Sequence, residues 1–164
     1  EGQRQQARPG NAHAARKRDV RLERLGVEGD AASTGYRVLS AGHYAAPYAA
    51  WAKEADIMRG LPDGRFAPDA PITRQELATA LARYAALCGA ERGDTSAPVY
   101  NDQAAIADWA KDGVALCGQL GLLVGANGTF SPTDTATRAM GAVILQRLDE
   151  ADLRPQPVEN GSNI

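Results

Sequence analysis

Apolar residues recur at helical spacing along three stretches of the chain. The first contains Ile106, Trp109, Ala110, Val114, Cys117, Leu120 and Leu123, which advance mainly in steps of three and four. The other two contain Leu77, Ala80, Leu81 and Tyr84, and Met140, Val143, Ile144 and Leu148. These steps match the helical repeat of about 3.6 residues, so each stretch predicts a helix with one apolar face.

A duplicated segment surrounds these helices. The residues Gly64-Arg65-Phe66-Ala67-Pro68, followed by Thr73-Arg74, return with the same internal spacing as Gly128-Thr129-Phe130-Ser131-Pro132 and Thr137-Arg138. Upstream, the interval from Tyr44-Ala45 to Gly60 equals the interval from Trp109-Ala110 to Gly125. The shared order and register indicate two copies of one repeat, which we call copy one and copy two.

Each copy is predicted to form a helix, a loop and a second helix. Pro68 and Pro132 stop the preceding structure, and Thr73 and Thr137 are placed to cap the second helices. Glu76, three residues after Thr73, completes a capping box. Because one such hairpin cannot bury its own apolar face, we expect the copies to stack. The fold class is therefore all-α, with tandem helix-loop-helix repeats packed as a small helical bundle.

The composition and charge of the chain limit the kinds of partner that it is expected to bind. Only 5% of the 164 residues are aromatic, so the core must be built largely from small side chains. The net charge of −2 supplies no positive field for nucleic acid or an anionic membrane surface. A spanning helix needs roughly 20 consecutive apolar residues, and the chain has no such run. We therefore expect no nucleic-acid partner and no membrane span.

The repeats divide the chain into four segments. Residues 1–35 are rich in Gln, Arg, Gly and Ala, include the basic run Arg16-Lys17-Arg18, and are interpreted as an irregular N-terminal arm. The arm is either flexible or ordered by a partner. Residues 36–90 and 98–152 form the two repeats, and residues 153–164 form a C-terminal tail.

Little in the sequence supports catalysis or a cofactor. The two histidines, His13 and His43, have no evident acid partner, and no nucleophile motif or phosphate-binding loop is present. Cys88 and Cys117 lack metal-ligand spacing, so no metal site is expected. They lie on elements that become neighbours if the repeats stack, which leaves open a disulfide or two separate buried thiols. We expect a non-enzymatic protein.

The duplicated motifs resemble the S-layer homology family. Copy one carries Gly60-Leu61-Pro62-Asp63-Gly64-Arg65-Phe66-Ala67-Pro68 and Ile72-Thr73-Arg74-Gln75-Glu76-Leu77, and copy two carries Tyr100-Asn101-Asp102, Trp109-Ala110 and Thr137-Arg138-Ala139. Val38 stands where the family has the Asp that copy two keeps at Asp102, and Met140 replaces the usual Glu. The resemblance spans roughly residues 36–150.

The resemblance implies a fold, a ligand and a location. Family members generally form three repeats in a pseudo-threefold bundle, with grooves that bind pyruvylated cell-wall polysaccharide. Two repeats are visible in this sequence. The third is therefore degenerate within the first 35 residues, supplied by a partner chain, or absent because the repeats serve another assembly. The implied location is secreted, at a bacterial cell wall or surface. The alternative function is a structural subunit or adaptor that uses the repeats and the arm to contact copies of itself or other surface proteins.

The same resemblance points to glycan-binding residues. Arg74 and Arg138 match the position implicated in gripping the pyruvyl carboxylate, beside Glu76 in copy one; the alternative for an arginine is a structural bond to Glu76 or to a loop carbonyl. Tyr44 and Trp109 match the position of an aromatic that can face a sugar, although core packing is the favoured interpretation. Asp63 and Asn127 can bind sugar hydroxyls, but a turn role is favoured.

Overall fold

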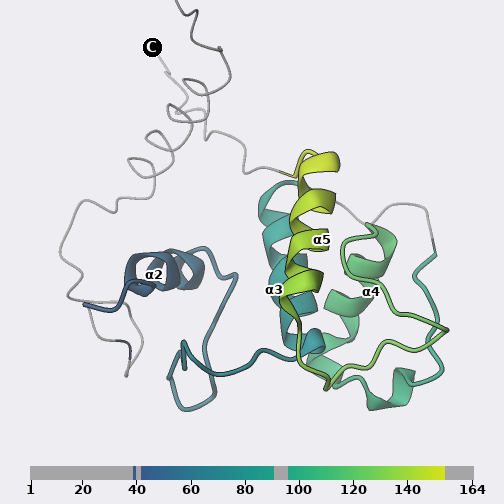
Figure 1. Ribbon diagram of the computed structural model, residues 1–164, viewed down its shortest axis with the longest axis horizontal. Helices are drawn as coiled ribbons and strands as arrows, with labels where there is room; N and C mark the ends of the chain where they lie inside the picture. The colour runs from purple at the N-terminus through teal and green to yellow at the C-terminus, as the bar shows by residue number, and fades with distance from the viewer. Residues whose placement is uncertain (1–38, 40–41, 91–95, 154–164) are drawn as a thin grey trace, which may run out of the picture.

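The computed structural model describes residues 39, 42–90 and 96–153, and this part of the chain is helical (Figure 1). Its helices are α2 (Ala46–Glu54), α3 (Arg74–Leu87), α4 (Lys111–Gln119) and α5 (Arg138–Glu150), with short 3-10 helices η1 (Gln103–Ala105) and η2 (Asp108–Ala110) before α4. The predicted all-α class is confirmed for the described residues. None of these helices is long and apolar enough to cross a membrane. The predicted arm and nearly all of the predicted tail lie outside the described residues.

The predicted caps begin the second helix of each copy. At α3 the Thr73 hydroxyl accepts from the Glu76 amide at 3.4 Å, and the Glu76 carboxylate accepts from the Thr73 amide at 2.8 Å. The capping box is therefore confirmed. At α5 the Thr137 hydroxyl accepts from the Met140 amide at 3.2 Å, and the methionine cannot return a bond. Copy two thus keeps half of the box.

The first helix of copy two begins later than its apolar pattern predicts. Ile106 is buried as expected, but Ile106 and Ala107 are extended, and α4 begins at Lys111. The Ala107 amide donates to the Gln75 side-chain oxygen at 3.1 Å, and this bond to copy one satisfies the amide outside a helix. The prediction of a helix from Ile106 is wrong because a tertiary contact overrides the local pattern.

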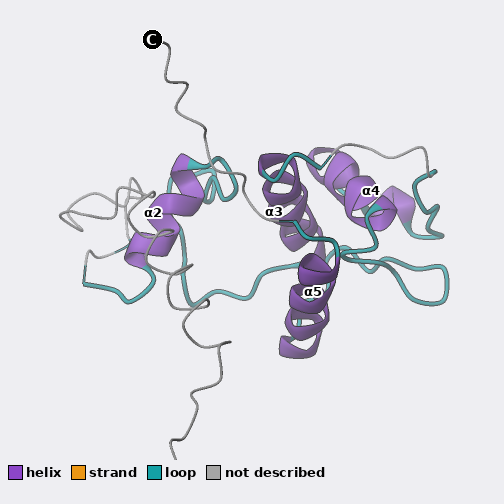
Figure 2. Ribbon diagram, turned by 90° about the horizontal axis from the view of Figure 1, so that it is seen from above, coloured by secondary structure: helices purple, strands orange, loops and turns teal. Residues whose placement is uncertain are grey.

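The main core forms between the copies rather than within one hairpin. Helix α3 of copy one packs on α4 of copy two, and α5 adds Ile144 to the same core, whereas α2 stands apart from all three (Figures 1 and 2). At Gly113 the approach is so close that an added Cβ would meet the Thr79 Cα at 2.9 Å. The Arg83 guanidinium connects α3 to the first half of copy one by donating to the Ile57 carbonyl at 3.4 Å. The expected stacking is confirmed.

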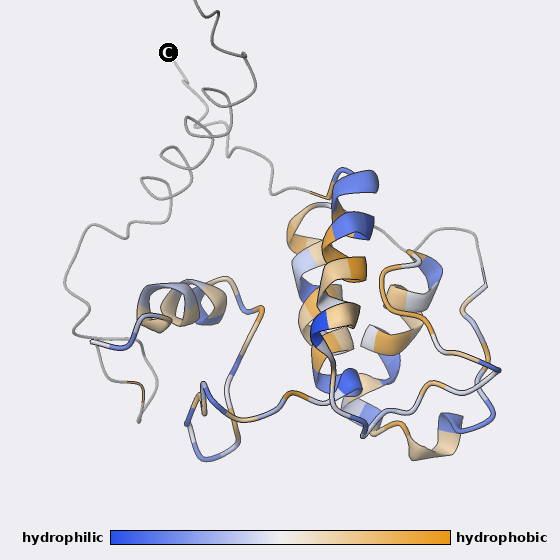
Figure 3. Cartoon of the chain, in the orientation of Figure 1, coloured by the Kyte–Doolittle hydropathy of each residue, from blue (hydrophilic) through white to orange (hydrophobic). Residues whose placement is uncertain are grey.

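Apolar side chains gather where these helices meet. Figure 3 shows apolar residues along α3, α4 and α5, with hydrophilic residues towards the C-terminal end of α5. The buried residues of this core are Ala78, Leu81, Ala82, Tyr100, Ile106, Ala110, Val114, Cys117, Leu123, Phe130 and Ile144. A smaller cluster around α2 contains Leu39, Ala46 and Ala49, against which Phe66 packs. Copy one and copy two are therefore buried to unequal extents.

The core interpretation of the two helix aromatics is wrong. Tyr44 is 82% exposed and Trp109 is 57% exposed. Their helical neighbours take the inward positions, because Ala46 and Ala110 are buried while the aromatic rings point outward. Where an alanine makes the close inward contact, there is no room for a large ring.

The two cysteines are buried thiols that form no disulfide. The Cys117 thiol donates to the Ala78 carbonyl at 3.2 Å. Cys88 lies ten residues beyond Ala78 along the same helix, a rise of about 15 Å, whereas a disulfide requires Cα atoms within about 7 Å. Cys117 therefore packs against the N-terminal half of α3, whereas Cys88 lies at the C-terminal cap of that helix. Burial raises the pKa of the Cys117 thiol to about 12.

Candidate functional site

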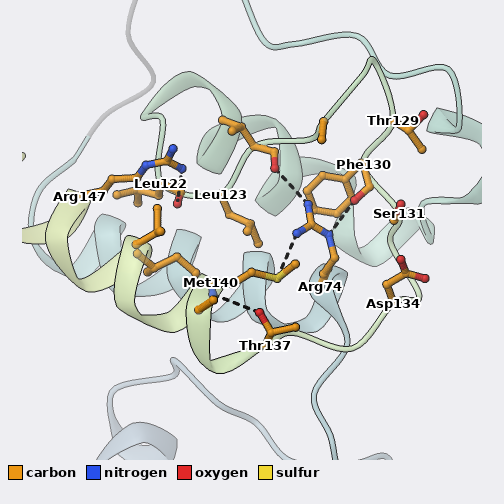
Figure 4. Close-up of a pocket in the computed structure, with 15 residues that line it drawn as sticks. Arg74, Leu122, Leu123, Thr129, Phe130, Ser131, Asp134, Thr137, Met140 and Arg147 are labelled. Carbon is orange, nitrogen blue, oxygen red and sulfur yellow. Dashed lines mark hydrogen bonds between the residues drawn. The ribbon is translucent and has the colours of Figure 1, made fainter.

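Arg74 joins copy one to the loop of copy two. It is the first residue of α3 and is only 6% exposed. Its Nε donates to the Phe130 carbonyl at 2.8 Å, its Nη2 to the Val124 carbonyl at 3.1 Å and its Nη1 to the Met140 sulfur at 3.3 Å (Figure 4). The guanidinium carbon also lies 4.8 Å from the centre of the Phe130 ring. The structural alternative of a bond to loop carbonyls is the one observed.

Backbone hydrogen bonds also join the start of α3 to copy two. The Arg74 amide donates to the Asp134 carbonyl at 2.8 Å, and the Gln75 amide donates to the Pro132 carbonyl at 3.0 Å. In return the Ala136 amide donates to the Ile72 carbonyl at 3.0 Å. The first amides of a helix have no partner within the helix, and here copy two supplies their acceptors.

The Asp102 carboxylate fixes the backbone of the loop in its own copy, copy two. One carboxylate oxygen accepts from the Phe130 amide at 2.8 Å and the other from the Ser131 amide at 2.7 Å. The Phe130 bond is the largest cause that holds the pKa of Asp102 below its ordinary value, against an opposing effect of burial. Ser131 has a left-handed backbone with φ of 56°, which the bond to its amide helps to fix. The carboxylate therefore helps to set the position of the Phe130 carbonyl that Arg74 binds.

A groove of about 510 Å³ opens beside this junction (Figure 4). Two guanidinium groups lie along it, because Arg74 enters from copy one and Arg147 from α5. Arg147 is partly exposed and donates to the Leu122 carbonyl at 3.3 Å. The remaining lining residues are Leu122, Leu123, Val124, Ala126, Thr129, Phe130, Ser131, Asp134, Thr137, Ala139, Met140, Val143 and Ile144. The groove thus combines two cations, the Asp134 carboxylate, hydroxyl groups and an apolar floor.

Of the predicted glycan-binding residues, Arg74 is the one that lines this groove. Glu76 is occupied by the capping box. Arg138, the first residue of α5, is exposed and makes no hydrogen bond or ion pair with any residue that the structure describes. The outward rings of Tyr44 and Trp109 lie elsewhere on the surface. A role for these side chains in glycan binding stays a prediction.

The two loop residues both serve turns. The Asp63 carboxylate accepts from the Arg65 amide at 3.0 Å and pairs with the Arg65 guanidinium at 2.5 Å. Asn127 and Gly128 have φ of 51° and 76°, and the amides of Ala126 and Thr129 each donate to the carbonyl of the other. Left-handed Asn-Gly is what such a tight turn requires. The geometry agrees with the favoured turn interpretation.

Sequence reasoning missed Arg147 as a groove residue. Arg147 takes the same place in copy two as Arg83 takes in copy one, and each donates from the second helix of its copy to a carbonyl after the first helix. The duplicated register was therefore a signal for this position, although it lies outside the loop motifs. Among the described residues no group of His, Cys, Asp and Glu is arranged to hold a metal ion.

Comparison with known proteins agrees with the duplicated architecture. The family model of the S-layer homology domain matches residues 40–78 and 99–139. An amylopullulanase of Thermoanaerobacterium thermosulfurigenes is 33% identical over 132 residues, which are 79% of this chain and 7% of that protein. Exoglucanase XynX of Acetivibrio thermocellus is 36% identical over 102 residues, which are 60% of this chain and 9% of that protein.

A third relative is a surface protein. Cell surface glycoprotein 1 of Acetivibrio thermocellus is 39% identical over 93 residues, which are 54% of this chain and 4% of that protein. The chain thus spans less than a tenth of the length of these relatives. No solved structure matches the chain. Two family matches in tandem, one on each copy of the helix-loop-helix repeat, show that the chain belongs to the S-layer homology domain family, whose members are cell-surface anchoring modules.

Proposed function

We propose that the chain attaches its parent protein to a bacterial cell wall by binding an anionic polysaccharide in this groove, which is lined by copy two and by Arg74 of copy one. The observation that carries this proposal is the presence of two guanidinium groups along one open groove with an apolar floor. A guanidinium binds carboxylates through directed, charge-assisted hydrogen bonds. A pyruvylated sugar supplies such a carboxylate, together with hydroxyl groups and an apolar ring face.

Arg74 and Arg147 are placed for different roles in binding. Arg74 already gives one hydrogen each from Nε, Nη1 and Nη2 to copy two, and each Nη carries a second hydrogen. Arg147 uses Nη1 for the Leu122 carbonyl and is more exposed than Arg74. Arg147 is therefore the cation better able to turn towards a ligand, and Arg74 adds positive potential from a fixed position.

The start of α5 adds polar groups at one end of the groove. Thr137 and Ala139 line the groove, and no described group accepts a hydrogen bond from the amides of Arg138 and Ala139. The equivalent amides of α3 are bound to carbonyls of copy two. A helix N-terminus favours an anion, so this end supplements the two guanidinium groups, and Arg138 adds charge at the rim.

The relatives support an attachment role that is separate from catalysis. The match in each is a small fraction of a longer protein, and two of those proteins are named as glycan-degrading enzymes and one as a surface glycoprotein. We infer that the chain is a non-enzymatic module of a secreted protein whose other activities lie elsewhere. A rival role in surface assembly through residues 1–35 rests on a segment outside the described residues.

Replacing Arg147 with glutamine is the test of the groove. We expect the retention of the chain by purified cell walls to fall about tenfold or more, because one charge-assisted hydrogen bond is worth about 1.5–3 kcal/mol. Retention is measured by sedimenting the chain with walls over a range of wall concentrations. Wild-type retention should also weaken as the salt concentration rises.

Arg83→Gln is the matched control, because Arg83 makes the equivalent carbonyl bond in copy one and does not line the groove. It should retain wild-type wall binding. Equal losses in the two variants would mean that the arginines act through stability, and unchanged retention of Arg147→Gln would refute the groove as the binding site.

A further inference from the structure

The tight turn of copy two carries an exposed asparagine directly before a glycine. Asn127 and Gly128 are the two central residues of this turn, with φ of 51° and 76°. The amides of Ala126 and Thr129 each donate to the carbonyl of the other at 2.9 Å. Positive φ at both central positions, between residues paired in this way, is characteristic of a type I′ turn. The Asn127 side chain makes no hydrogen bond with any residue that the structure describes.

The peptide group that joins Asn127 to Gly128 is also unbonded. Neither the Asn127 carbonyl nor the Gly128 amide makes a hydrogen bond within the described part of the chain. The Gly128 carbonyl accepts from the Asn101 amide at 2.8 Å, but it belongs to the following peptide group. Rotation of the unbonded peptide group converts a type I′ turn into a type II′ turn. Both types connect paired strands, so the bonds between Ala126 and Thr129 can be kept.

The type II′ conformation brings the Gly128 nitrogen towards the Asn127 side chain. Its first central residue has φ of about 60° and ψ of about −120°, the mirror image of a type II turn. This ψ places the next nitrogen on the same side of the Cα–C bond as Cβ, which is the arrangement that closes a five-membered ring through Cγ. Asn127 already has the required φ, and Gly128 has no Cβ to oppose the rotation.

We propose that Asn127 is a site of spontaneous deamidation in the folded chain, with the Gly128 amide nitrogen as the nucleophile. Hydroxide removes the Gly128 amide proton, and the nitrogen attacks Asn127 Cγ. A new carbon–nitrogen bond forms, the Cγ–Nδ2 bond breaks, and ammonia leaves with a proton from water, which regenerates hydroxide. Water then opens the cyclic imide at Cγ to give aspartate, or at the main-chain carbonyl to give isoaspartate. The net reaction consumes one water and releases one ammonia.

Copy one has the equivalent dipeptide in an arrangement that opposes this reaction. Asp63 and Gly64 align with the Asn-Gly pair, but Asp63 does not have a left-handed backbone. The Gly64 amide donates to the Leu61 carbonyl at 2.8 Å, and the Asp63 carboxylate accepts from the Arg65 amide at 3.0 Å. The nitrogen and the side chain that must react are therefore both held by hydrogen bonds in copy one. In copy two no described residue holds either group.

Deamidation adds a negative charge beside the groove. Ala126, directly before Asn127, lines the groove, and so does Thr129. Copy one has an aspartate at the equivalent position, so we expect the aspartate product to be compatible with the fold. If the groove binds an anionic polymer, the new carboxylate opposes that binding, and this consequence rests on the proposed function. The modification itself does not depend on it.

Ageing of the full 164-residue chain tests the site. The folded chain is incubated in mildly acidic and in mildly alkaline buffer, and mass spectrometry follows the peptide that contains Asn127. We expect conversion of the amide to the acid, faster in alkaline buffer, with both aspartate and isoaspartate among the products. Circular dichroism should show that the chain stays folded. Conversion in urea but not in the folded chain, or aspartate without isoaspartate, would overturn the proposal.

Asp63→Asn is the matched control, because it places a second Asn-Gly pair in the hydrogen-bonded turn of copy one. We expect this asparagine to convert at least about tenfold more slowly than Asn127 in the same molecule, since it must break hydrogen bonds and take up a left-handed φ. Equal rates at the two positions would overturn the role of the turn. Asn127→Gly, which suits a positive φ, should gain no acid at this position.

Asn127→Asp measures the effect of the product on wall binding. We expect purified cell walls to retain this variant about threefold less than Asn127→Gly at low salt, because one added surface charge opposes an anionic ligand modestly. Equal retention of the two variants would overturn the effect on binding. A wild-type chain that the walls do not retain would instead contradict the anchoring proposal, and the mass spectra would still decide whether Asn127 deamidates.

Discussion

Replacing Arg74 with alanine is expected to lower the free energy of unfolding by about 3 kcal/mol or more. The change removes the guanidinium from the Phe130 and Val124 carbonyls and leaves these acceptors without their donor at the junction. It also removes the contact with the Phe130 ring. Urea denaturation, followed by helical circular dichroism, measures the loss.

Arg138→Ala is the matched control, because Arg138 is the equivalent first residue of α5 and is exposed. Its effect on stability should stay within about 0.5 kcal/mol in the same measurement. Equal losses at the two positions would show that Arg74 does not hold the copies together.

Replacing Phe130 with alanine is expected to cost about 3–5 kcal/mol, as for other fully buried aromatic residues. The ring has no exposed surface, and its centre lies 5.3 Å from that of Tyr100. Its removal opens a cavity beneath Arg74 and at the floor of the groove. Thermal unfolding should shift to lower temperature, and wall binding should weaken with it.

Phe66→Ala supplies the comparison in copy one. Phe66 occupies the same motif position but is partly exposed, and it packs against the α2 cluster. Its replacement should cost about half as much as that of Phe130, since less surface is withdrawn from water. A larger loss from Phe66 than from Phe130 would contradict the unequal burial of the two copies.

Local features of the fold could be predicted from the sequence because they depend on neighbouring residues. Thr73 and Glu76 form their capping box within one helical turn, and Asn127-Gly128 forms its turn within a few residues. The duplicated motifs also indicated the family and the stacking of the copies. These features need no knowledge of which surface the rest of the chain covers.

Burial at equivalent positions could not be predicted from the motif alone. Arg74 and Arg138 share the same Thr-Arg context, yet Arg74 is covered by the loop of copy two and Arg138 by no described segment. Trp109 is apolar and in helical register, but alanines take the close-packed positions beside it. The difference lies in tertiary contacts, which also moved the start of α4 from Ile106 to Lys111.

The sequence predicted part of the candidate site, because the rest of the site depends on tertiary contacts. Arg74 was identified by its motif, whereas its bonds to the Phe130 and Val124 carbonyls depend on how copy two folds over it. Arg147 lies outside the motif and enters the groove only because α5 passes beside the copy-two loop. The sequence signal for Arg147 was Arg83, the residue at the equivalent position of copy one.

Calorimetric titration of the chain with purified wall polysaccharide tests anchoring most directly. The polymer should be compared before and after removal of its acidic substituents, at fixed ionic strength, with sugar composition otherwise unchanged. We expect the intact polymer to bind and the neutral polymer to bind at least about tenfold more weakly, since guanidinium–carboxylate bonds carry the recognition. Equal binding of both polymers, or no binding of either, would contradict recognition of an anionic wall polymer by this groove.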